Sequence, residues 1–71
     1  FNNELTFFPN PTNGRIFFKS EVDKVEIFSL NGQKLSSFKN VSVLNLNLEK
    51  GLYLMRLFDG PKFSNHKIVI N

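Results

Sequence analysis

Apolar and polar residues alternate along much of the chain, which is typical of strands that bury one face. The clearest run is 43–48, where Leu44, Leu46 and Leu48 share one face. No stretch of about ten residues shows a helical stripe. The pattern therefore predicts an all-β fold, a small antiparallel β-sandwich of about seven short strands. The expected strands cover residues 5–8, 15–19, 24–30, 33–38, 43–48, 52–58 and 66–70.

A hairpin is predicted at the centre of the pattern, where two apolar runs flank Asn31-Gly32. Asn-Gly favours a type I′ turn, which needs positive φ at both central residues. Val25 and Ile27 share one face of the first strand, and Phe28 lies on the opposite face. The other segments are expected to pair with this hairpin or to cover it.

Turn residues separate the remaining strands. Pro9, Asn10, Pro11 and Gly14 predict a rigid turn, because the prolines fix φ and remove amide donors. A ligand-binding loop is the alternative for this segment. We also expect a polar link at 20–23 and turns at 39–40, 49–51 and 59–61.

The composition limits how many domains the chain can form and which kinds of partner it can bind. The chain has 71 residues, enough for a single domain spanning 1–71, and nine Phe but no Cys. The net charge is +3 and the basic residues are scattered, which does not favour a nucleic-acid stripe. No apolar run approaches the ~20 residues of a membrane-spanning helix. Residue 1 is Phe, so we expect the chain to be cut from a longer protein with any signal peptide upstream.

Neither catalysis nor cofactor binding is expected. The chain has one histidine, His66, and no cysteine nucleophile. Ser64, His66 and Asp59 could be combined into a triad, but the sequence gives no reason to place them within hydrogen-bond reach. We therefore expect His66 to be a surface residue. No metal-ligand spacing surrounds it, so no metal site is predicted.

The order of the motifs resembles the C-terminal sorting domain of the type IX secretion system of certain Gram-negative bacteria. The motifs are an aromatic residue followed by Pro-Asn-Pro and a glycine, a V-x-I-x-x-x-x-G hairpin, a G-x-Y strand and a short closing strand. They cover nearly the whole chain, although Phe8 stands where Tyr is frequent. The residues that carry them, and that we expect to determine the fold, are Phe8, Pro9, Asn10, Pro11, Gly14, Val25, Ile27, Asn31, Gly32, Gly51 and Tyr53.

The resemblance implies an Ig-like β-sandwich at the C-terminus of a larger exported protein. Such a domain directs its covalently fused upstream cargo through the periplasm and across the outer membrane, and a sortase-like peptidase commonly removes it. The implied partners are this secretion machinery and the peptidase. The implied location is the outer-membrane surface or the extracellular space.

Two groups of residues are candidates for recognition by that machinery. The first is the final strand, Lys67, Ile68, Val69 and Ile70, which could accept an added strand at a free edge or could simply complete the core. The second is an outer-face group, which is either contiguous or dispersed: Phe17, Phe28, Leu30, Leu54 and Phe58.

Two other functions remain open from the residues alone. Exposed Phe and Tyr could bind sugars in a carbohydrate-binding or adhesive module appended to a secreted enzyme, although the chain has no Trp. A structural Ig-like spacer is the other alternative. The sequence also leaves open whether the domain dimerises through an edge strand.

Overall fold

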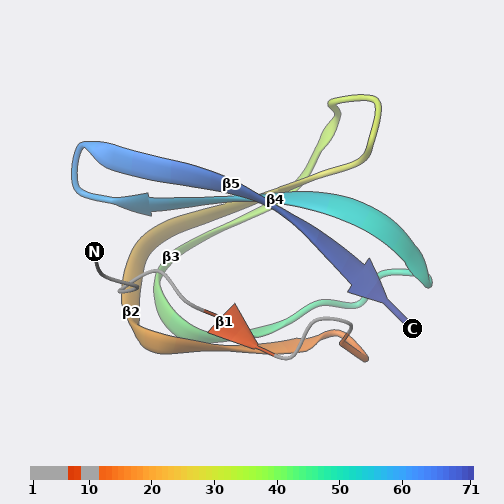
Figure 1. Ribbon diagram of the computed structural model, residues 1–71, viewed down its shortest axis with the longest axis horizontal. Helices are drawn as coiled ribbons and strands as arrows, with labels where there is room; N and C mark the ends of the chain where they lie inside the picture. Colours follow the sequence, from red (N-terminus) through yellow and green to blue (C-terminus); the bar gives the residue numbers. More distant parts are fainter. Residues whose placement is uncertain (1–6, 9–11) are drawn as a thin grey trace.

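The described part of the chain forms five antiparallel strands in one hydrogen-bonded sheet (Figure 1). The computed structural model describes residues 7–8 and 12–71, and this part of the chain contains no helix. The all-β prediction is confirmed. The strands are β1 (Phe7–Phe8), β2 (Arg15–Phe28), β3 (Lys34–Asn45), β4 (Gly51–Asp59) and β5 (Lys62–Ile70).

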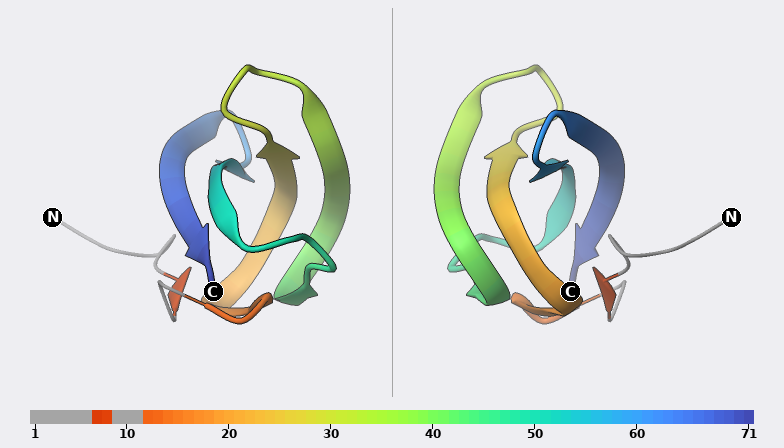
Figure 2. Two further views of the ribbon diagram at one scale, coloured as in Figure 1. Left: turned by 90° about the vertical axis from the view of Figure 1, so that its right-hand side faces the viewer. Right: turned by 90° about the vertical axis from the view of Figure 1, so that its left-hand side faces the viewer.

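The long strand β2 organises the sheet because it pairs with three others. Its start pairs with β1, and its end, from Lys24 to Phe28, pairs with β4 on the same edge. Its opposite edge pairs with β3 in both halves. Figure 1 shows β2 curving at one end of the molecule, so that its first half lies across from β4 and β5. The end-on views of Figure 2 show the single sheet folded over onto itself.

Two of the predicted strand breaks are wrong. Residues 20–23 lie inside β2, and residues 39–40 lie inside β3. The register shifts between Phe17 and Val22, where β2 has more residues than its partner, and Asn40 takes a positive φ of 53°. Such irregularities bend a strand without ending it. The polar residues at these positions therefore mark bends, and the seven predicted strands reduce to five in the described part.

The predicted hairpin joins β2 to β3, but its turn is not type I′. The Gly32 amide donates to the Ser29 carbonyl at 3.0 Å, and the Ser29 amide donates to the Gln33 carbonyl at 2.9 Å. Gly32 has a φ of 93°, whereas Asn31 is not among the described residues with positive φ. This arrangement is a tight turn followed by one left-handed glycine, as in a longer hairpin loop with a bulge.

The core lies between the two halves of the bent sheet. The alternation predicted the inner faces correctly: Val25 and Ile27 of β2 and Met55 and Leu57 of β4 are fully buried. Burying one such side chain stabilises the fold by roughly 1.5–3 kcal/mol. The buried apolar residues form one cluster: Ile16, Phe18, Val22, Val25, Ile27, Leu44, Leu46, Met55, Leu57, Ile68 and Ile70.

Candidate recognition surfaces

The end of β5 is hydrogen-bonded on both edges. One edge pairs with β4 along the whole strand. On the other edge, the Thr12 amide donates to the Val69 carbonyl and the Asn71 amide donates to the Thr12 carbonyl, both at 2.8 Å. Thr12 and Ile70 thus form a parallel bridge. Of the two alternatives for the final strand, a free backbone edge is therefore not available at the Val69 carbonyl or the Asn71 amide.

The side chains of β5 divide between the core and the surface. Ile68 and Ile70 are buried and complete the core. Lys67 and Val69 point the other way and are exposed. Lys67 is the register partner of Leu54, and Val69 is the partner of Leu52. The outward half of the final strand therefore belongs to the same surface as the outer face of β4.

The outer face of β2, β4 and β5 brings together part of the predicted apolar group. Phe28, Leu54 and Lys67 are successive register partners across the three strands, so they form one row of this face. Phe58 lies four residues further along the same face of β4, with Arg56 between them. By contrast, Phe17 lies in the first half of β2 and Leu30 in the hairpin loop, so the predicted group is not one patch.

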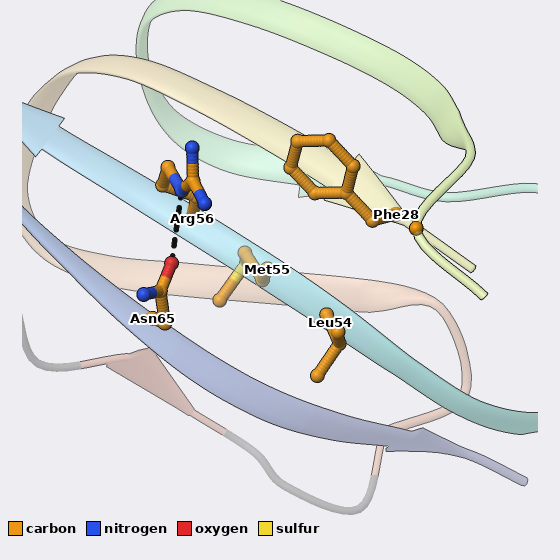
Figure 3. Close-up of a pocket in the computed structure, with 6 residues that line it drawn as sticks. Phe28, Leu54, Met55, Arg56 and Asn65 are labelled. Carbon is orange, nitrogen blue, oxygen red and sulfur yellow. Dashed lines mark hydrogen bonds between the residues drawn. The ribbon is translucent and has the colours of Figure 1, made fainter. Parts of the chain in front are cut away.

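Arg56 lies at the centre of this face, and the sequence analysis did not single it out. Its guanidinium carbon is 5.4 Å from the ring centroids of both Phe28 and Phe63. Its Nε donates to the Asn65 Oδ1 at 2.9 Å. Figure 3 shows Arg56 and Asn65 on neighbouring strands with Phe28 beside them. A hollow of about 330 Å³ opens here, lined by Phe28, Gly32, Leu54, Met55, Arg56 and Asn65.

The carboxylate of this face is neutralised within the domain. Glu26 Oε2 lies 3.1 Å from the Lys34 Nζ and 3.3 Å from the Lys24 Nζ. Its side chain is only 8% exposed, because the two lysines cover it. The hydrogen bond from Lys34, and then the contact with Lys24, hold the pKa of Glu26 below its ordinary value, although burial opposes them. Glu26 is therefore a satisfied part of the surface and offers no free anion.

Thr12 is a second residue that the sequence analysis missed. It is 2% exposed, and its Oγ1 donates to the Arg15 carbonyl at 2.6 Å and accepts from the Gly14 amide at 3.1 Å. Together with its two backbone bonds, Thr12 links the start of β2 to the end of β5. A threonine two residues before a glycine is a signal for such a turn.

Ser64 and His66 lie closer together than the sequence suggested. Ser64 Oγ and His66 Nε2 are 2.8 Å apart, because residues two apart share a face of β5. His66 is half-buried, not a surface residue, and its ring meets the edge of Phe7 with 5.1 Å between centroids. Burial lowers the pKa of His66. Within the described residues, no carboxylate is bonded to this pair, and no group of three side chains could hold a metal ion.

A family model described as the secretion system C-terminal sorting domain matches residues 6–71 of the chain. The chain belongs to this family. The search of curated proteins finds no match for the chain. Family membership supports a signal for type IX secretion, and it implies a fused upstream cargo, contact with the secretion machinery and export across the outer membrane. Residues 7–8 and 12–71 include no helix that could span a membrane.

Several motif residues of the sorting domain lie in the described part of the chain, at the turns and strand ends of the sheet. Gly14 takes a φ of 113°, and its carbonyl accepts from the Leu46 amide at 2.7 Å. Gly51 begins β4, and the half-buried Tyr53 donates its hydroxyl to the Glu49 carbonyl at 2.6 Å. Pro9, Asn10, Pro11 and the Phe8 side chain lie outside the described residues, so their predicted roles remain predictions.

Proposed function

We propose that this sorting domain directs a covalently attached upstream cargo through the type IX secretion system, and that a sortase-like peptidase then removes it. The cargo would reach the outer-membrane surface or the extracellular space. The observation that carries this proposal is the family match over residues 6–71. In this role the domain acts as an address and does no chemistry itself.

The fold suits an address because the domain has its own core. The bent sheet encloses one apolar cluster in the manner of an Ig-like sandwich, and we propose that this is its fold type. A domain with its own core does not need the cargo to complete it. The information read by the machinery must then lie on the outer surface of the domain.

We propose that this information lies on the outer face of β2, β4 and β5. The row of Phe28, Leu54 and Lys67 joins the two groups that the sequence analysis treated separately. Val69 and Leu52 extend the face and are 37% and 40% exposed. Exposed apolar residues that adjoin in this way are typical of a contact surface.

Transfer of the domain to a foreign passenger tests the function. The 71-residue chain is fused to the C-terminus of a periplasmic reporter in a host with type IX secretion, and cell-surface and medium fractions are assayed. We expect export and loss of the domain from the exported reporter. A reporter that stays in the periplasm would favour a structural spacer. Saturable glycan binding by the unexported fusion would favour a carbohydrate-binding module.

Single substitutions in the same fusion test the surface. Leu54→Ser should lower export at least several-fold while the domain still unfolds cooperatively, because its side chain lies on the outer face. Leu30→Ser is the matched control, since Leu30 is 58% exposed but lies in the hairpin loop. Equal export of both variants would mean that this face is not the address.

A further inference from the structure

The outer face of β2, β4 and β5 is strongly unbalanced in charge. Side chains of register partners point to the same face, and among residues 7–8 and 12–71 this places one carboxylate side chain, Glu26, on the face. The cations of these strands on the face are Lys24, Arg56 and Lys67, and the adjoining strand β3 adds Lys34 and Lys39. Since Lys24 and Lys34 already neutralise Glu26, this carboxylate does not compensate the charge of Arg56.

Arg56 is the cation of this face that is held in place. The bond from Nε to Asn65 fixes one side of the guanidinium, and the rings of Phe28 and Phe63 both lie within 5.4 Å of its central carbon. An arginine side chain that is already held by aromatic rings and a hydrogen bond loses less conformational entropy when it binds a partner. No carboxylate of residues 7–8 or 12–71 forms an ion pair with Arg56.

The hollow beside Arg56 is apolar on its other sides. Phe28 and Leu54 flank it, and Gly32 of the hairpin loop contributes no side chain. A Cβ at Gly32 would meet nothing within 4 Å, so the loop leaves this side open. The site therefore combines one oriented cation with a small apolar surface.

We propose that this hollow binds a protein segment in which a carboxylate adjoins an apolar side chain. The carboxylate would pair with the end of the Arg56 guanidinium, and the apolar side chain would contact Phe28 and Leu54. Arginine matches the geometry of a carboxylate, and a charge-assisted bond is stronger beside apolar groups than in open water. The inference rests on the proposed function, because it names the chemistry of the partner that reads the domain.

The fixed positions of the cations on this face favour a peptide carboxylate over an anionic membrane surface, because Glu26 holds Lys24 and Lys34 and Asn65 holds Arg56. Membrane attraction depends on several mobile basic side chains that project toward the headgroups. Here the central cation is partly covered and fixed by Asn65 at 2.9 Å. The hollow suits one carboxylate with its neighbouring side chain.

A pair of small probes tests the site directly. N-acetyl-leucine and N-acetyl-leucinamide share the apolar side chain, but only the first carries a carboxylate. Each is titrated into the isotope-labelled 71-residue chain while the amide and Arg56 Nε–H signals are followed by NMR. We expect saturable shifts at Arg56, Phe28 and Leu54 with the acid, and binding at least tenfold weaker with the amide.

Matched variants assign the effect to Arg56. Arg56→Gln should lose the difference between acid and amide, and Arg56→Lys should keep only part of it because the forked donor is gone. Arg15→Gln is the control, since Arg15 also lies over a ring, Phe17 at 5.8 Å, but in the first half of β2. Equal binding of acid and amide, or unchanged acid binding by Arg56→Gln, would overturn the inference.

Two further measurements separate this inference from its alternatives. Binding of the chain to phosphatidylglycerol vesicles through Arg56, without binding of the acid probe, would replace the peptide partner by a lipid surface and overturn the proposal. In the reporter fusion, normal export of a folded Arg56→Gln variant would refute the inference while leaving the sorting function intact. Failure of the unsubstituted fusion to be exported would instead refute the function itself.

Discussion

Thr12 and Ile70 lie side by side in a parallel bridge, although 58 positions of sequence separate them (70 minus 12). The bridge contributes two backbone bonds of 2.8 Å, and the rest of the sheet is antiparallel. It joins the residue before the Asn13-Gly14 turn to the end of the last strand. The motif at the start of the sorting domain therefore holds the end of the domain in place.

Replacement of Thr12 should show how much this link stabilises the fold. Thr12→Val keeps the shape but removes the hydroxyl that bonds the Gly14 amide and the Arg15 carbonyl. Because both groups would lose a partner in a buried place, we expect a loss of about 1–3 kcal/mol in the free energy of unfolding. Urea denaturation measures it.

Thr12→Ser is the control for that experiment, because it retains the hydroxyl. It should lose less stability than Thr12→Val. Hydrogen exchange of the Asn71 amide should quicken most in Thr12→Val, since that amide donates to the Thr12 carbonyl. If valine and serine at this position gave equal stability, the hydroxyl would have no structural role.

Two glycines with positive φ should respond differently to alanine. A Cβ on Gly14 would lie 2.5 Å from the Leu46 carbonyl oxygen, so the backbone must move. A Cβ on Gly32 meets nothing within 4 Å. We expect Gly32→Ala to lose about 1–2 kcal/mol from its backbone conformation alone, and Gly14→Ala to lose about 3 kcal/mol or more.

Thermal and urea unfolding of the two alanine variants provide the comparison. The backbone conformation alone is unfavourable in both, so the difference between them reports the contact with Leu46. A loss in Gly14→Ala no greater than in Gly32→Ala would show that the strand end near Leu46 moves aside at little cost.

The inner faces of the strands were predictable because alternation directly reports which residues are buried. Leu44 and Leu46, which the pattern assigned to one face, are 1% and 8% exposed. The strand ends were less predictable. A bend such as that at Asn40 uses the same polar residues as a turn, and only the pairing of β3 with β2 on both sides shows that the strand continues.

The candidate surface was predictable in part for a related reason. Phe28 and Leu54 could be assigned to outer faces from alternation, but their adjacency depends on the register between β2 and β4. Arg56 gave no signal of its own, since a single arginine in a strand is ordinary. Its role depends on Phe63 and Asn65, which come from another strand.

Glu26 should make the stability of the domain depend on pH in the acidic range. Its pKa is lowered in the folded state from an ordinary value of 4.5. The contribution of its contacts with Lys34 and Lys24 is thus present above pH 4.5 and is lost as the pH falls through the folded-state pKa. Glu26→Gln should be less stable than the unsubstituted chain at neutral pH and should approach it in acid.

Urea denaturation at a series of pH values measures the Glu26 contribution. Glu21→Gln is the control, because Glu21 is an exposed glutamate of the same strand. It should differ little from the unsubstituted chain at neutral pH. A constant difference between Glu26→Gln and the unsubstituted chain from neutral to acidic pH would contradict the ion pairs as its source.

His66 should make the stability of the domain depend on pH in a second range, above that of Glu26. Burial lowers its pKa in the folded state from 6.5, because the charged ring is disfavoured between Phe7 and the core. The unfolded chain then binds a proton more readily than the folded one. The contribution of His66 to stability is therefore largest above pH 6.5 and falls as the pH drops toward the folded-state pKa, below which the loss is complete.

His66→Gln removes this titration while keeping a side chain that can bond Ser64. The difference in unfolding free energy between this variant and the unsubstituted chain should shift in favour of the variant between pH 8 and pH 5. Because His66 is the one histidine of the chain, a pH-independent difference would show that the ring stays solvated when the domain folds.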